Sequence, residues 1–406
     1  MRILLLLIFV VGPMLTMAQV PEELEAYAYT HNPKLLATYK AFERSMQEAA
    51  QVKNMADPEL SIGYFIQPIE TRNGTQVAKL SLMQMFPWFG SYKAQYASRA
   101  AVAEARYQEF LKEKALLKVA LTQAWFPLAE QANLLALEQE NQQVLTAYKT
   151  MAERQFENNK AGMVDVLRVD LMLQQSITEV EILQQQRKSL QTTFYTLLNV
   201  PEDTVMNFSD ALLPLKQDLQ PLDSISAQHP EIVAARQMQS SGEMALKAAH
   251  KAGMPQFKLG LDYMFVGNTP LEAPNAGQDA IMPMAAITLP IFRKKYKAKK
   301  AAAELAVEEW TYREEASWNA LKRDLENTLF ELSQAQKLLD LYELQLTESR
   351  HALNLLYTAY ANDGKDFEEV LRMQQLLLNY EKQRVKALTN IQKIWAKYEY
   401  LQAGQE

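Results

Sequence analysis

Residues 257–265, with the sequence FKLGLDYMF, decide the fold that this chain is expected to adopt. Apolar side chains occupy every second position of this stretch, and Lys258, Gly260 and Asp262 lie between them. Alternation with a period of two is typical of a strand that has one apolar face. Residues 60–67 alternate in a similar way, and a second β-rich segment follows each stretch. The sequence therefore predicts four strands in two pairs.

The two strand pairs belong to an internal duplication. Gly63 recurs as Gly260, 197 positions later, and the segment VLR at 166–168 recurs at 370–372, 204 positions later. Constant shifts over several landmarks are the signature of a structural repeat. The difference of seven residues arises within 64–90, which is shorter than its copy and is expected to contain the shorter loop.

Long helices are expected to follow each strand pair. Glycine is rare, at 12 of 406 residues, and none occurs for about seventy residues after Gly90 or after Phe292. A helix of about seventy residues is about 100 Å long at 1.5 Å per residue. Pro127 is expected to kink the first of these helices. We predict a first repeat at 19–198 (a helix, strands within 58–86, helices 91–160 and 164–199), a linker at 199–221, and a second repeat at 222–406 (a helix, strands within 255–292, helices 293–361 and 367–402).

The N-terminal residues 1–18 are typical of a secretory signal peptide. Arg2 precedes an apolar run at 3–11, and the small residue Ala18 offers a cleavage site. The alternative of a membrane anchor is disfavoured, because this run is too short to cross about 30 Å of hydrocarbon. Cysteine is absent, which excludes disulfides, thiolate metal sites and a lipidated N-terminal Cys. The sequence predicts an exported protein that has no lipid anchor.

Composition and motifs argue against several classes of function. The net charge is −6 and 22% of the residues are charged, so the chain lacks the basic character of nucleic-acid binders. It contains no P-loop, no Gly-x-Ser-x-Gly and no His-Glu-x-x-His sequence. We therefore expect neither an enzyme nor a protein with a cofactor.

Strands with an apolar face in an exported chain suggest a membrane location. Every backbone polar group within a bilayer must be paired, so a sheet there must close on itself. Four strands are too few, because bacterial barrels begin at eight strands. Two copies would supply eight strands and three copies twelve. The alternative is a water-soluble sheet of four strands packed on helices.

The sequence resembles the TolC-like family of outer-membrane efflux proteins over nearly the whole mature chain. The resemblance is carried by features in a duplicated order: Asn32-Pro33 and His229-Pro230 at helix starts, Pro87–Phe89 and Pro290–Phe292 after the strand pairs, and the turns at 162–168 and 364–372. It implies a mainly α-helical protein with a transmembrane β-barrel portion. Three chains would form a 12-stranded barrel, located in the outer membrane, and an α-helical tunnel in the periplasm.

The resemblance also implies function and partners. It implies an exit duct that docks to a periplasmic adaptor protein and an inner-membrane pump, of which the resistance-nodulation-division type is one candidate. Residues 67–72 and 84–90 locally resemble the heavy-metal-efflux branch of the family. Two alternatives remain: a pump-independent outer-membrane porin and a structural coiled-coil protein of the periplasm. The sequence does not identify the cargo.

The helical turns contain the candidate gate residues. Relatives close the periplasmic tip with acidic residues held by basic and Tyr side chains, and the resemblance carries these roles to positions here. Arg372 stands where a second acidic residue is expected, so ion pairs between helices are one hypothesis and solvated helix ends the other. The candidates are Asp165, Arg168, Tyr360, Lys365, Glu369 and Arg372.

Methionines and aromatic residues mark the strand region. Met83 and Met85 share one strand face, as do Met282 and Met284. Thioethers suit soft ions such as copper or silver, although Met more often fills gaps or faces lipid. Trp88, Phe89 and Phe292 are predicted to lie in an aromatic belt at the membrane interface.

Overall fold

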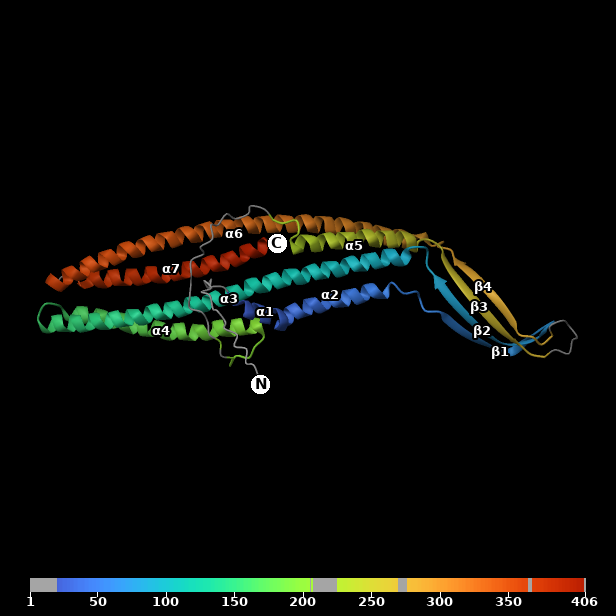
Figure 1. The fold of residues 1–406 in the computed structure, drawn as a ribbon, viewed down its shortest axis with the longest axis horizontal. Helices are drawn as coiled ribbons and strands as arrows, with labels where there is room; N and C mark the ends of the chain where they lie inside the picture. The colour runs from blue at the N-terminus through green and yellow to red at the C-terminus, as the bar shows by residue number, and fades with distance from the viewer. Residues whose placement is uncertain (1–19, 205, 207–224, 269–275, 364–366, 405–406) are drawn as a thin grey trace, which may run out of the picture. The chain divides into compact units, whose positions relative to one another are not determined.

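A computed structural model describes residues 20–204, 206, 225–268, 276–363 and 367–404 (Figure 1). The predicted signal peptide, most of the predicted linker and Lys365 lie outside these residues. The chain forms two compact units, one made of residues 1–36, 113–229 and 320–406 and the other of residues 37–112 and 230–319. Each unit contains residues from both predicted repeats.

The described residues form seven helices and four strands, which confirms the predicted fold class of long helices with two strand pairs. Their order and bounds are α1 (Glu22–His31), α2 (Pro33–Gln51), β1 (Glu59–Thr71), β2 (Gly74–Phe86), α3 (Ser91–Glu157), α4 (Met163–Leu198), α5 (Pro230–Ala252), β3 (Gln256–Val266), β4 (Ala280–Thr288), α6 (Arg293–Asp363) and α7 (Phe367–Leu401). Pro127 lies inside α3, which continues past it. Helix α1 was not predicted, because its short sequence has little amphipathic pattern.

The strands form one antiparallel sheet in the order β1-β2-β3-β4. Thr71 and Gly74 close the tight hairpin between β1 and β2, where Gly74 has a φ of 129° that other residues rarely adopt. Pairing of β2 with β3 joins the two repeats, with Leu82 opposite Leu261 and Ser81 opposite Asp262. Among the strands that the structure describes, β1 and β4 each pair on one side only, so they are the edges of the sheet.

In the unit that contains the sheet, the ends of four helices lead to and from the strands (Figure 1). Aromatic rings join α2 to α3, where the Tyr39 and Phe110 centroids are 5.2 Å apart. Arg236 in α5 pairs with Glu314 in α6 at 2.7 Å. In this unit, side-chain contacts therefore join α2 to α3 and α5 to α6.

The other unit consists mainly of two antiparallel helical hairpins, α3 with α4 and α6 with α7 (Figure 1). In the first hairpin Lys149 pairs with Asp170 at 2.6 Å. In the second, an apolar cluster holds α6 against α7; its buried members are Leu332, Ala335, Leu339, Ala387, Leu388, Ile391 and Ile394. Among the described residues, no helix combines the length and the apolar character needed to cross a membrane.

Candidate functional site

The turns of the two hairpins share one apolar cluster, which places the predicted gate residues close together. Its members come from α3, α4, α6 and α7, so the two repeats meet here through their equivalent turns. The buried residues are Leu145, Tyr148, Ala152, Val166, Val169, Tyr360, Phe367, Val370 and Leu371. This buried cluster packs the helix ends against one another, and the charged turn residues lie on those helix ends.

Tyr360 lies inside the cluster rather than at a solvated helix end. Only 1% of its surface is exposed, and its ring stacks on Phe367 with centroids 4.7 Å apart. Within the described part of the chain its hydroxyl has no hydrogen-bond partner. Burial, together with the negative charge of Asp165, raises the pKa of Tyr360. The ring is thus held by packing, and the predicted contact to a basic residue is not among those that the structure describes.

Asp165 stabilises the start of α4. Its carboxylate accepts a hydrogen bond of 3.3 Å from the backbone N–H of Gly162. A carboxylate in the first turn of a helix also interacts favourably with the helix dipole. The local structure therefore explains this acidic residue without a gate.

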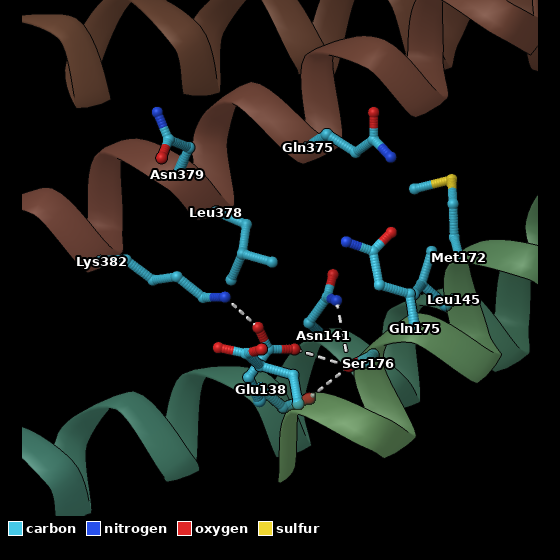
Figure 2. A pocket seen from close by; sticks show the side chains of 11 residues that line it. Glu138, Asn141, Leu145, Met172, Gln175, Ser176, Gln375, Leu378, Asn379 and Lys382 are labelled. Atoms are coloured by element: carbon cyan, nitrogen blue, oxygen red, sulfur yellow. Dashed lines mark hydrogen bonds and ion pairs between the residues drawn. The ribbon is translucent and has the colours of Figure 1, made fainter. Parts of the chain in front are cut away.

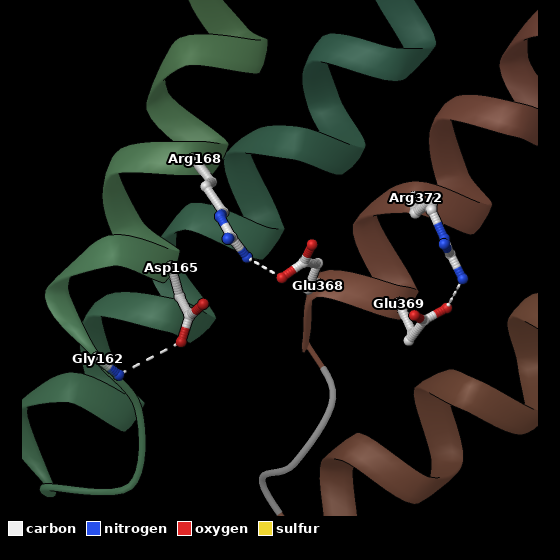
Figure 3. Close-up of polar contacts among 6 residues, drawn as sticks. All are labelled: Gly162, Asp165, Arg168, Glu368, Glu369 and Arg372. Atoms are coloured by element: carbon white, nitrogen blue, oxygen red, sulfur yellow. Dashed lines mark hydrogen bonds and ion pairs between the residues drawn. The ribbon is translucent and has the colours of Figure 1, made fainter.

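The basic turn residues differ in what they connect (Figure 3). Arg168 in α4 binds Glu368 in α7 at 2.5 Å and so bridges the two hairpins. Arg372 binds Glu369 three positions earlier in the same helix. Both pairs are exposed, and exposed pairs contribute only about 0.2–1 kcal/mol each. Of the two, only the pair of Arg168 and Glu368 opposes separation of the hairpins.

A buried polar network lies further along the hairpins (Figure 2). Glu138 in α3 is 2% exposed and forms an ion pair with Lys382 in α7. The hydroxyl of Ser176 in α4 donates a hydrogen bond of 2.6 Å to the same carboxylate. The network borders a cavity of about 510 Å³ between α3, α4 and α7. A buried ion pair is costly unless its partners are held in place, so this network fixes the position of α7 relative to the first hairpin.

The sequence of α3 contains a signal for this network. Buried residues of α3 recur at spacings of three and four, and Gln131, Glu138 and Asn141 occupy such positions among Leu134 and Leu145. Polar side chains within an apolar stripe indicate a specific partner, because an unpaired buried polar group is costly. Glu368 was also missed, since its partner is 200 residues away in the sequence.

The sheet has one apolar face and one polar face. Several apolar side chains of the first face are more than half exposed, among them Leu60, Ile62 and Tyr64 at 59%, 76% and 72%. Across the strands the apolar residues of this face include Leu60, Ile62, Tyr64, Leu80, Leu82, Leu259, Leu261, Tyr263, Ile281, Ala285 and Ile287, with Gln84 as a polar member. A contiguous apolar surface of this kind marks contact with a membrane or a partner.

The opposite, polar face carries an ion pair between Lys79 and Asp262. Ser61, Ser81 and Lys258 share this face. The sequence-based assignment of Asp262 and Leu261 to different faces therefore agrees with the register.

The aromatic residues predicted to lie at the membrane interface are found between strands and helices. Trp88 and Phe89 lie between β2 and α3, and Phe292 lies between β4 and α6. The Trp88 ring stacks on Phe257 with centroids 5.9 Å apart. Phe89 and Phe292 are 78% and 74% exposed. Exposed aromatic rings at one end of an apolar sheet are typical of a membrane interface.

Solved structures with this arrangement are known. The chain matches the outer membrane protein VceC of Vibrio cholerae with a TM-score of 0.74 and 15% identity, over 95% of this chain and 96% of that one. It matches CusC, described for its folding and transmembrane channel formation, with a TM-score of 0.78 and 16% identity, over 94% and 92%. The chain has the fold of TolC-like outer-membrane channels.

A third similar structure is the open state of the MtrE outer membrane channel of Neisseria gonorrhoeae. It has a TM-score of 0.73 and 16% identity, over 94% of this chain and 88% of that one. No protein-family model and no curated protein matches the sequence. The likeness to TolC-like channels therefore lies in the arrangement of helices and strands, because the sequence identity to these structures is low.

Proposed function

We propose that this chain is the outer-membrane exit duct of a tripartite efflux system. The observation that carries the proposal is the match to outer-membrane channels over nearly the full length of both chains. The sheet supports it independently, because one exposed apolar face and one polar face suit a wall between lipid and water.

In this proposal three copies close the sheet into a barrel of twelve strands. The edges β1 and β4 would pair between neighbouring chains, because unpaired strand edges are not tolerated in a bilayer. The helical hairpins would form the wall of a periplasmic tunnel, which receives cargo from an adaptor and an inner-membrane pump. Trp88, Phe89 and Phe292 would lie at the membrane interface, and the N-terminal signal peptide would direct export.

The turn residues would form the closed end of the tunnel. The bridge between Arg168 and Glu368 is the contact that would have to break when the hairpins separate. Glu369 and Arg372 would act through charge around the opening, with Asp165 holding the turn, Tyr360 supporting it from the cluster, and Lys365 as a further basic residue. The heavy-metal branch remains a prediction from the local resemblance at 67–72 and 84–90.

Membrane fractionation and conductance test the duct. We expect the full chain in the outer-membrane fraction and, in planar bilayers, a channel with low resting conductance that rises when the adaptor is added. Conductance that is high without any adaptor would favour the pump-independent porin. Recovery in the soluble periplasmic fraction would overturn the duct and favour the structural coiled-coil protein.

A further inference from the structure

Five methionines lie on the polar face of the sheet, namely Met83, Met85, Met264, Met282 and Met284. The register places Met83 of β2 opposite Gly260 of β3, and Gly260 opposite Met284 of β4. Met85 and Met282 share this face but lie in the two rows on opposite sides of the Gly260 row, since Met85 pairs with Lys258 and Met282 pairs with Asp262. The sequence indicated two separate pairs, and strand pairing brings one member of each, Met83 and Met284, to the two sides of Gly260.

Gly260 lets two of these side chains approach each other. A Cβ atom at this position would lie 2.9 Å from Cγ of Met83 and 3.8 Å from Cε of Met284. Because each of these carbons is bonded directly to the sulfur of its side chain, both thioethers extend over the same missing side chain. Any larger residue at 260 would separate them.

The surroundings favour a soft cation over a hard one. Asp262, on the neighbouring row, is already paired with Lys79, so its carboxylate is engaged. Within the described part of the chain there is no group of three or more His, Cys, Asp or Glu residues that could hold a metal ion. Thioether sulfur is a soft ligand and selects monovalent copper over magnesium, calcium or manganese.

We propose that Met83 and Met284 form a binding site for a soft monovalent cation such as Cu⁺ or Ag⁺. The ion is bound without a change of oxidation state. The inference rests on the proposed duct only for the route by which the ion arrives, since the polar face would then line the lumen. The site itself is made by one chain.

Silver binding to the full-length detergent-solubilised protein tests the site. Ag⁺ is titrated in chloride-free buffer, and bound silver is measured by equilibrium dialysis. We expect one Ag⁺ per chain, and we expect Met83→Leu with Met284→Leu to weaken binding at least about tenfold, an affinity change of about 1.4 kcal/mol. Leucine preserves most of the side-chain volume, so the sheet should remain folded.

The matched control is Met46→Leu with Met55→Leu, which removes two exposed methionines outside the sheet. Equal silver affinity in the two double variants, or no binding to the wild type, would overturn the site. X-ray absorption at the silver edge should show sulfur neighbours, and a spectrum with only oxygen neighbours would overturn it as well. Conductance of the same preparations keeps the two proposals apart: a wild type that conducts but binds no silver refutes the site and leaves the duct standing.

Discussion

Asp262 and Leu261 are neighbours in β3, yet the register places them on opposite faces of the sheet. Leu261 contributes to the apolar face, where Leu261→Val would preserve apolar surface. Asp262 balances the charge of Lys79 on the polar face. Because neighbouring residues of a strand lie on opposite faces, Leu261 is expected to face lipid and Asp262 to face the lumen.

We predict that Asp262→Leu changes ion selectivity and that Leu261→Val does not. Loss of the carboxylate leaves Lys79 unpaired, so the lumen should become more attractive to anions. The reversal potential under a salt gradient measures this shift. Unchanged selectivity in Asp262→Leu would show that the polar face does not line the pore.

Tyr29 is expected to make the free energy of unfolding depend on pH in the alkaline range. Burial and the nearby Glu25 carboxylate raise the pKa of Tyr29 to about 12. Tyrosine in an unfolded chain ionises near pH 10, at about its ordinary pKa. Between about pH 10 and pH 12 the folded state therefore holds the proton more tightly, so this contribution to stability is full below pH 10 and is lost as the pH rises.

We predict that Tyr29→Phe reduces the loss of stability across this pH window. The aromatic ring is kept, and only the ionisable hydroxyl is removed. Urea-unfolding midpoints at several pH values between about 9 and 12 measure the effect. A variant with the same slope as the wild type would contradict the assigned role of Tyr29.

At the scale of the helices, Glu138 and Lys382 connect α3 to α7 through a buried ion pair. We predict that Lys382→Met destabilises the folded state by about 3 kcal/mol, because the Glu138 carboxylate is then buried without a counter-charge. The double variant Glu138→Leu with Lys382→Met should be closer to the wild type, since no unpaired charge remains.

Urea unfolding of the two variants, compared with the wild type, measures this difference. If the single variant were as stable as the double variant, the carboxylate would have another compensating partner or access to water through the adjoining cavity. That result would show that the Glu138–Lys382 network does not determine the position of α7.

The two exposed ion pairs at the turns make a matched comparison. We predict that Arg168→Gln raises the resting conductance, whereas Arg372→Gln has a smaller effect, because Arg168 bridges two hairpins and Arg372 stays within one helix. High salt should raise the wild-type conductance in the same direction by screening the bridge.

Exchanging the charges, with Arg168→Glu and Glu368→Arg together, should restore the low resting conductance. Planar-bilayer recordings at low salt decide between the pairs. A larger effect of Arg372→Gln would contradict the role of the Arg168 bridge and favour the pair of Glu369 and Arg372 as the contact that keeps the channel closed.

The elements were predictable from sequence because their patterns are local. Alternation at 257–265 reflects two faces of one strand, and the absence of glycine reflects uninterrupted helices. The partners of charged residues were less predictable, since the bridge from Arg168 reaches a residue 200 positions away and depends on how the hairpins pack. Asp165 illustrates the same limit: its residue type suggested a gate, and its position also makes it part of a helix cap.

At the scale of the whole molecule, one chain leaves its sheet incomplete. Strands β1 and β4 have free edges, and long free edges promote pairing with another chain. Helix α6 also carries large exposed apolar side chains, including Tyr312 at 70% and Phe330 at 69% exposure. Both features indicate surfaces that a second copy would cover.

We predict a closed trimer, held by pairing of β1 in one copy with β4 in the next. The chain has no cysteine, so any disulfide that forms must join cysteines introduced by mutation. Ser61→Cys in β1 can be combined in turn with Ala280→Cys, Ala286→Cys or Thr288→Cys in β4, all on the polar face. A disulfide requires Cα atoms about 4.4–6.8 Å apart, so only the pair in register should link.

Oxidation in native membranes should give a ladder of monomer, dimer and trimer that ends at the trimer, since a ring of twelve strands has no edge left to pair. Monomers alone in every combination would contradict edge pairing, and bands beyond the trimer would contradict closure at three copies.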